Sequence, residues 1–294
     1  MRLSISHRTT YLYTPPASRV TQVLRLTPRN HDGQYVVSWR IDVSADCRLD
    51  QHEDAFGNIT HAFAADGPLP ELTLLVEGEI ETRDAQGVVR DAVERFPPSL
   101  FLRETELTAC DADIAAFAAA ARESEDDTLK VLHRLLERVH EGMELDADRT
   151  YVATTAAEAF ARNHGICQDF AHIFIAASRS LEIPARYVGG YFCREDGAPM
   201  QDGGHADGGH ADAAHADVGH VDGGHAWAEA FVPDLGWVAF DPVNGFCATD
   251  AHARVAVGLD HLGAAPVRGM RHGGGTETLA VDIHVDQASR QTQS

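Results

Sequence analysis

The hydrophobic period of this chain changes twice along its length, and these changes constrain the fold more than any single motif. Residues 1 to about 95 contain short alternating or β-branched runs separated by turn signals, a pattern typical of antiparallel strands. Between 111 and 181 the apolar residues recur at helical spacing instead. Strand-like runs return at 186–192, 225–232 and 237–241. Strands, then helices, then strands predict an α+β architecture.

The Pro-containing segment 96–99 is the expected boundary between two domains. Residues 1–95 are predicted to form an antiparallel, sandwich-like β-domain. Residues 96–294 are predicted to form an α+β domain in which helices precede an antiparallel sheet. The expected N-caps of its first three helices are Asp111, Asp126 or Asp127, and Thr155.

The formal net charge of −21 argues against two classes of partner. Nucleic acids and anionic membranes both select a basic face, which so acidic a chain does not favour. No apolar run approaches the roughly 18 residues of a membrane span, and the N-terminus has no apolar signal-peptide core. Five cysteines at long spacings, without a CxxC pair, are typical of free thiols in a reducing compartment. We therefore expect a cytoplasmic protein.

A cysteine begins the strongest helical pattern of the chain. After Cys167 the large apolar residues fall at Phe170, Ile173 and Phe174, which is helical spacing with one face buried. The expected position of Cys167 is therefore a helix N-terminus, where the dipole and free backbone N–H groups favour a thiolate. A thiolate is a nucleophile, and it needs a base and an orienting group to become a catalyst.

A histidine and an aspartate downstream have the contexts that these two roles require. His225 starts an alternating strand with Trp227 and Phe231, and Asp241 ends the next strand. A hairpin turning at 233–236 would bring the two side by side. The imidazole would then accept the thiol proton, while the carboxylate would fix its tautomer. We expect Cys167, His225 and Asp241 to form one catalytic site.

A five-residue repeat interrupts this pattern. It occupies an insert at 203–224, and it places an aspartate two residues after each of four histidines, namely His205, His210, His215 and His220. The Gly- and Ala-rich filler predicts a solvated low-complexity loop. Histidine and aspartate at short range can also bind Zn²⁺ or Ni²⁺, so a metal-handling role is an alternative. The main reading requires neither a cofactor nor a metal.

Three segments together resemble the transglutaminase-like superfamily. They are Gly165-Ile166-Cys167-Gln168-Asp169-Phe170-Ala171, His225-Ala226-Trp227 and Asp241-Pro242. Further segments, among them 24–29, 54–58, 184–191 and 252–269, resemble the bacterial branch that carries an N-terminal β-domain. The resemblance implies a papain-like core with a Cys-His-Asp triad, in enzymes described as cysteine proteases, amidases or transglutaminases. Two residues depart from the bacterial pattern, because Leu259 and His261 stand where those members tend to have Arg and Tyr.

The resulting expectation is acyl transfer from an amide through a thioester on Cys167, to water or to an acceptor amine. The backbone N–H of Cys167 would supply one oxyanion donor. Candidates for the second donor are Gln168, Tyr187 and Tyr191, while Asp169 and His172 could support the site from behind. The expected partner is a peptide or amide substrate, and the resemblance suggests work beside amide-forming enzymes. A catalytically silent binding module with the same fold is the other alternative.

Overall fold

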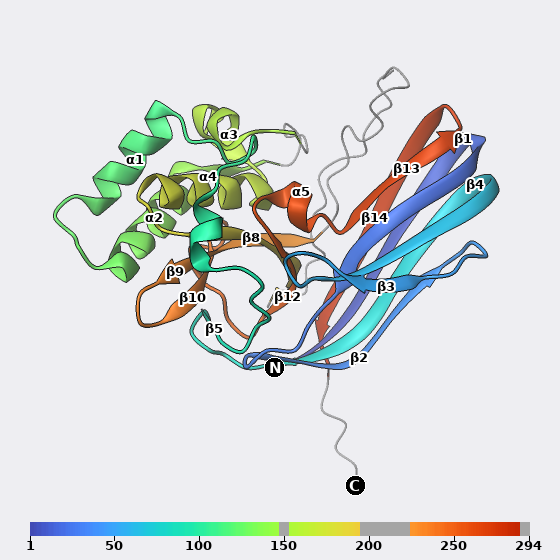
Figure 1. Cartoon of the computed structure of the whole chain (residues 1–294), viewed down its shortest axis with the longest axis horizontal. Coiled ribbons are helices and arrows are strands. Elements are labelled where there is room, and N and C mark those ends of the chain that lie inside the picture. The colour runs from blue at the N-terminus through green and yellow to red at the C-terminus, as the bar shows by residue number, and fades with distance from the viewer. Residues whose placement is uncertain (147–152, 195–223, 289–294) are drawn as a thin grey trace, which may run out of the picture.

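The computed structural model describes residues 1–146, 153–194 and 224–288 (Figure 1). Two six-stranded antiparallel sheets account for most of the described strands, and most of the helices lie at the left of the view, away from the first sheet (Figure 1). The repeat histidines His205, His210, His215 and His220 lie outside the described residues, so metal binding there stays a prediction. No helix in the described part of the chain is long and apolar enough to cross a membrane.

Long strands build the first sheet. Strand β1 (Arg2–Thr27) pairs with β4 (Ile59–Thr82) over most of its length, and β2 (Gln34–Val43) and β3 (Asp50–Glu53) pair with β4 on its other side. Every second side chain of β1 is buried over long stretches, as expected for a strand with one face against a core. The sequence pattern predicts several short strands in this region, whereas β1 and β4 are each one long strand.

The first sheet bends back on itself where prolines interrupt its ladder. The β1–β4 pairing loses its register around Pro15 and Pro68, because proline cannot donate a ladder hydrogen bond. Trp39 of β2 lies opposite Gly78, which in turn lies opposite the start of β1. The Trp39 indole nevertheless donates to the carbonyl of Leu26, near the end of β1, over 2.9 Å. The two ends of β1 are therefore close in space. Buried apolar side chains of β1 and β4 form a core inside this bend, with Trp39 packed against it.

The last two described strands belong to this first sheet. Strand β13 (Val267–Gly273) pairs with the second half of β1, and β14 (Thr276–Gln287) pairs with its first half. The sequence pattern predicts a second domain of residues 96–294 and indicates no strand beyond Asp241. A boundary near residue 95 therefore separates strands that share one hydrogen-bonded sheet.

The helices form a layer around one buried helix. They are η1 (Pro98–Leu102), α1 (Ala112–Arg122), α2 (Thr128–Gly142), α3 (Ala156–Arg162), α4 (Cys167–Ser180) and the short α5 (His261–Ala264). The predicted N-caps are present, because side chains of Asp111, Asp127 and Thr155 accept hydrogen bonds from backbone N–H groups of their helices. Helix α4 is buried on nearly all sides between the other helices and the second sheet.

The second sheet has the strand order β11-β10-β9-β8-β12, with β5 (Val88–Val89) added beside β10. Its strands are β8 (Ala185–Phe192), β9 (His225–Val232), β10 (Gly236–Asp241), β11 (Phe246–Cys247) and β12 (His252–Gly258). The predicted hairpin joins β9 to β10. A short parallel pair, β6 (Glu144–Leu145) and β7 (His164–Gly165), leads into α4.

Two amide side chains from the first sheet's region join the sheets at the outer edge of β12. The Gln34 amide accepts from the backbone N–H of Arg254 and donates to its carbonyl, each over 2.8 Å. The Asn58 amide makes the same two bonds with Val257, again over 2.8 Å. Each amide thus replaces a neighbouring strand at that position, and β12 is held against the first sheet.

Candidate active site

Cys167 is the first residue of α4, as the sequence pattern predicts. Ile166 is the N-cap, and its backbone N–H donates to the Asp169 carboxylate over 2.9 Å. Gly165 allows this arrangement, because a Cβ at that position would lie 2.6 Å from the Asp169 carboxylate. The Cys167 sulfur is partly exposed and lies 3.9 Å from the carbonyl oxygen of Gly224. Asp169 therefore acts as a support for the helix start.

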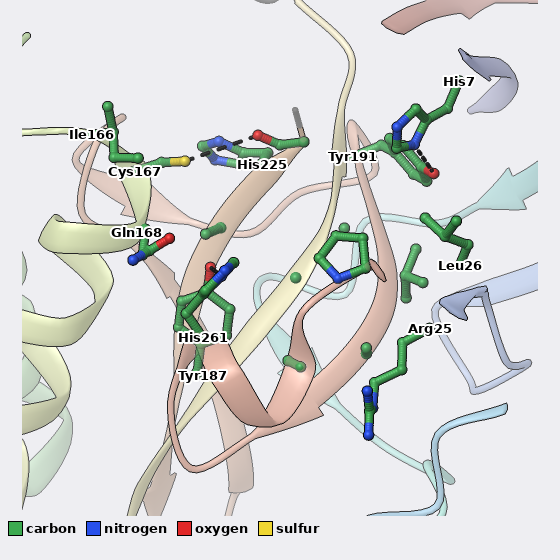
Figure 2. Close-up of a pocket in the computed structure, with 18 residues that line it drawn as sticks. His7, Arg25, Leu26, Ile166, Cys167, Gln168, Tyr187, Tyr191, His225 and His261 are labelled. Atoms are coloured by element: carbon green, nitrogen blue, oxygen red, sulfur yellow. Dashed lines mark hydrogen bonds between the residues drawn. The ribbon is translucent and has the colours of Figure 1, made fainter. Parts of the chain in front are cut away.

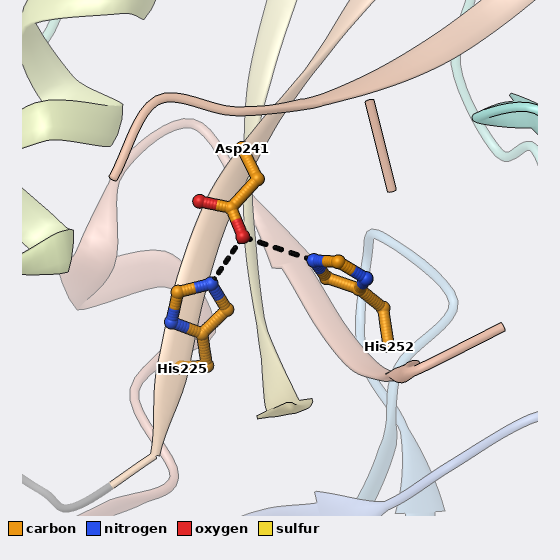
Figure 3. A group of neighbouring side chains, drawn as sticks. All are labelled: His225, Asp241 and His252. Atoms are coloured by element: carbon orange, nitrogen blue, oxygen red, sulfur yellow. Dashed lines mark hydrogen bonds and ion pairs between the residues drawn. The ribbon is translucent and has the colours of Figure 1, made fainter. Parts of the chain in front are cut away.

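His225 lies between Cys167 and Asp241. The β9–β10 register places the two strands side by side, and His225 Nε2 lies 2.6 Å from Asp241 Oδ2 (Figure 3). The imidazole also lies beside the Cys167 side chain, on the same wall of a pocket (Figure 2). Since Nε2 faces Asp241, Nδ1 is the nitrogen left for the sulfur. The three predicted residues are thus neighbours in the order Cys167, His225 and Asp241.

Burial and charge act against each other at this histidine. Burial alone would lower the pKa of His225, but the Asp241 carboxylate and the adjacent Cys167 side chain raise it to about 10. Burial would raise the pKa of Asp241, yet His225 and His252 hold it well below its usual range. An imidazolium facing a carboxylate is therefore the stable state of this pair at neutral pH.

Comparison with known proteins identifies the family of this chain. The description "Transglutaminase-like superfamily" matches residues 115–242, and "Bacterial transglutaminase-like N-terminal region" matches residues 3–81. The chain belongs to the transglutaminase-like superfamily. An uncharacterized protein of Mycobacterium leprae is 27% identical over 97% of this chain and 98% of its own length. Another, from Mycobacterium tuberculosis H37Rv, is 26% identical over 97% of this chain and 92% of its own.

A solved structure shares the fold of this superfamily member. It is that of a proposed cysteine protease from Cytophaga hutchinsonii, with a TM-score of 0.73. The alignment covers 100% of this chain and 92% of the other, at 19% sequence identity. At that identity the likeness establishes the fold, including the N-terminal β region.

His252 is a fourth member of the site. The sequence indicates it only as part of segment 252–269, which resembles the bacterial branch of the family. Its Nε2 lies 2.9 Å from Asp241 Oδ2, while its Nδ1 accepts a hydrogen bond from the backbone N–H of Thr249 over 3.1 Å. Burial lowers the pKa of His252 despite its contact with Asp241. The ring is therefore neutral, with its proton on Nε2 and donated to the carboxylate. No sequence spacing links β12 to β10, so only the alternating pattern of 252–258 could have indicated its burial.

The cluster of His225, Asp241 and His252 could resemble a metal site, since its ligand atoms lie within 4.8 Å of one another. A metal ligand must offer a lone pair, however. Because His252 Nδ1 accepts a hydrogen bond from Thr249, the imidazole proton is on Nε2, and Nε2 has no lone pair to offer a metal. Asn244 occupies the carboxylate further, with its side-chain amide donating to Asp241 Oδ2 over 2.7 Å and its backbone N–H to Oδ1 over 3.2 Å. The donor set fits a hydrogen-bonded carboxylate and does not fit a cation.

A pocket of ≈ 520 Å³, open to solvent, connects Cys167 to the first sheet. Gln168, Tyr187, Tyr191 and His225 line it, as Figure 2 shows, together with residues of β1. The Tyr191 hydroxyl lies 3.0 Å from His7 Nδ1 on the β1 side of the pocket. The Tyr187 hydroxyl lies 3.3 Å from His261 Nδ1. Of the predicted oxyanion candidates, Gln168 follows Cys167 directly, and both tyrosine hydroxyls contact histidines.

His172 is buried behind the pocket. Its Nε2 accepts a hydrogen bond from the backbone N–H of His261 over 3.0 Å, which fixes the start of α5. Burial lowers the pKa of His172 well below its usual value, so the ring is neutral. The predicted supporting role is thus a structural one that connects α4 to α5.

The charge on Asp241 should make the stability of this protein depend on pH. His225 has a folded pKa of about 10 against an ordinary 6.5, so its stabilising contribution is complete below pH 6.5 and is lost toward pH 10. Asp241 has a depressed pKa, so its contribution is complete above about 3.8 and is lost in acid. The difference in free energy of unfolding between wild type and Asp241→Asn should therefore be largest between about pH 4 and 6.5.

Urea unfolding of both proteins from pH 3 to 10 measures this difference. We expect it to shrink steadily above pH 6.5. A difference that stayed constant from pH 6.5 to 10 would show that Asp241 does not hold the proton on His225.

Proposed function

We propose that this protein is a thiol-dependent acyl-transfer enzyme that acts on amide bonds. The observation that carries the proposal is the position of His225, which touches the Cys167 side chain and lies 2.6 Å from the buried Asp241 carboxylate. An imidazolium stabilised in this way can keep a neighbouring sulfur in its thiolate form and can later release its proton.

The proposed reaction has two stages. The Cys167 thiolate attacks the amide carbonyl, and a carbon–sulfur bond forms while the carbonyl electrons move onto oxygen. The carbon–nitrogen bond then breaks, and the leaving amine takes the proton of His225. In the second stage a water or an acceptor amine gives its proton to His225 and attacks the thioester, which releases Cys167. General acid–base help of this kind contributes on the order of 10²–10⁴ in rate.

The proposed substrate is a peptide or another amide, held in the pocket beside Cys167. Helices before an antiparallel sheet, with the nucleophile on a helix and the base on a strand, would make the core papain-like. The name of the Cytophaga hutchinsonii protein favours hydrolysis, and the name of the superfamily favours transfer to an amine. Both acceptors use the same thioester, so the first stage is the one to test.

The test is to trap the thioester. The intact protein would be incubated with a library of peptides and simple amides, quenched in acid, digested and examined by mass spectrometry. We expect acyl adducts on the peptide that contains Cys167, and their loss on treatment with hydroxylamine. Adducts spread equally over Cys47, Cys110, Cys193 and Cys247 would contradict the proposal and favour a silent binding module.

A further inference from the structure

His261 is a histidine in the pocket to which the proposed reaction has so far given no role. It begins α5, immediately after the N-cap Asp260, and it lines the same pocket as Cys167, Gln168 and His225. In Figure 2 its ring lies with Tyr187 on the Gln168 side of the pocket, whereas His7 and Tyr191 lie on the opposite side. The residue is 5% exposed, so little of it beyond a pocket-facing edge is accessible.

Two hydrogen bonds fix the position of this ring. The backbone N–H of His261 donates to the buried Nε2 of His172 over 3.0 Å, and the Tyr187 hydroxyl lies 3.3 Å from His261 Nδ1. Burial lowers the pKa of His261 to about 4, so the imidazole is neutral at neutral pH. A neutral imidazole has one N–H and one lone pair. When Tyr187 donates to Nδ1, the proton is on Nε2.

The remaining nitrogen has no protein partner. Nε2 of His261 makes no hydrogen bond with any residue in the ranges 1–146, 153–194 and 224–288, and it is not among their fully enclosed polar atoms without a partner. With the proton on Nε2, it is an accessible donor in a pocket whose walls are largely apolar, with Ile166, Val255 and Ala264 among them. A held, neutral N–H donor with no competing partner is what an oxyanion site requires.

We propose that His261 is a catalytic residue that donates its Nε2–H to the carbonyl oxygen of the substrate, as the second oxyanion donor beside the backbone N–H of Cys167. Tyr187 and His172 are its positioning residues, since they fix the tautomer and the place of the ring. The proposal rests on the acyl-transfer function above. His261 takes the role for which Tyr187 and Tyr191 were candidates, because the hydroxyls of both tyrosines contact histidines. The proposal also gives a role to His261 as a residue that departs from the family pattern.

Two chemical probes separate an oxyanion donor from a group that activates the thiol. With p-nitrophenyl acetate the Cys167 sulfur bonds to the carbonyl carbon, negative charge develops on the carbonyl oxygen, and nitrophenolate leaves with the electron pair of the broken carbon–oxygen bond. With iodoacetamide the same sulfur displaces iodide from a methylene carbon, and no oxyanion forms. Only the first reaction needs the proposed donor.

The experiment compares His261→Leu, which removes the donor, with His261→Gln, whose amide can donate from a similar position. We expect His261→Leu to lower the rate of Cys167 acetylation about 10²–10³-fold, the typical loss for one oxyanion donor. Alkylation by iodoacetamide should stay within about two-fold of wild type, and His261→Gln should recover much of the acetylation rate. The matched control is His284→Leu, which removes a histidine of β14 that is 57% exposed and outside the pocket.

The outcomes are distinct. Unchanged acetylation in His261→Leu would overturn the proposal, and so would an equal loss of acetylation and alkylation, because that pattern indicates a disturbed nucleophile or fold. If Cys167 of the wild type reacts with neither probe faster than the other four cysteines, the acyl-transfer function itself fails. A selective loss of acetylation, with rescue by glutamine, would support His261 as the donor.

Discussion

Replacing Cys167 with alanine should abolish turnover of any amide that acylates the wild-type protein, with a loss on the order of 10⁶, as found when a nucleophile is removed from a triad. In the proposed reaction the Cys167 sulfur is the nucleophile, whereas His225 and Asp241 are paired with each other. The fold should survive, since the Cys167 side chain is partly exposed and the hydrogen bonds that join His225, Asp241 and His252 do not include it.

The matched control for this variant is Cys110→Ala. Cys110 also lies beside a helix start, immediately before the N-cap Asp111 of α1, and it is also partly exposed. Burial raises its pKa, however, and the nearby carboxylates of Glu104 and Asp111 raise it further. Steady-state assays with the substrate found by trapping, together with thermal unfolding, would compare the two. Residual turnover above a thousandth of wild type in Cys167→Ala would mean that another residue is the nucleophile.

Replacing Glu229 with glutamine should be the most destabilising of these substitutions, with an expected loss of about 3–5 kcal/mol, typical of breaking a buried ion pair. Glu229 is fully buried in the second sheet. It accepts from Arg186 over 2.6 Å and from two nitrogens of Arg254 over 2.7 and 3.2 Å. Arg186 is itself 1% exposed, and its guanidinium lies 3.9 Å from the ring centre of Trp237. Glutamine would remove the counter-charge that both cations share, and only Arg186 would keep a second carboxylate partner, Glu94.

The pH dependence gives this prediction a second readout. Burial would raise the pKa of Glu229, but Arg254 and Arg186 lower it to about 2. Its contribution is therefore complete above the ordinary value of 4.5 and is lost as the pH falls toward 2. The control is Glu79→Gln, in the exposed pair of Glu79 with Arg2, which should change urea stability little. Equal effects of the two variants at pH 7 would contradict the assignment.

Local sequence signals predicted the parts of the site that depend on short-range structure. A helix start is encoded by its neighbours, so Cys167 could be placed from the apolar spacing after it. A hairpin connects residues close in sequence, so the pairing of His225 with Asp241 followed from the turn between them. The five histidines of the repeat region differ in context, and the Ala-Trp pair after His225 distinguished the one that lies on β9.

Local sequence signals did not predict the contacts between segments that are distant in sequence. His252 joins the site because β12 pairs with β8 rather than with its neighbour in sequence. His261 reaches the pocket through contacts of α5 with α4, β8 and β12. Strands β13 and β14 return to the first sheet from the far end of the chain. None of these contacts leaves a periodic or spacing signal, because each depends on the register between segments that are distant in sequence.

The amides on the outer edge of β12 also affect how copies of this protein meet one another. An uncovered edge strand presents unpaired N–H and C=O groups that can recruit a strand from another molecule, and this leads to aggregation. On β12 the groups of Arg254 and Val257 are already bonded to Gln34 and Asn58. The same four bonds that hold the sheets together therefore protect the β12 edge of the second sheet from intermolecular strand addition.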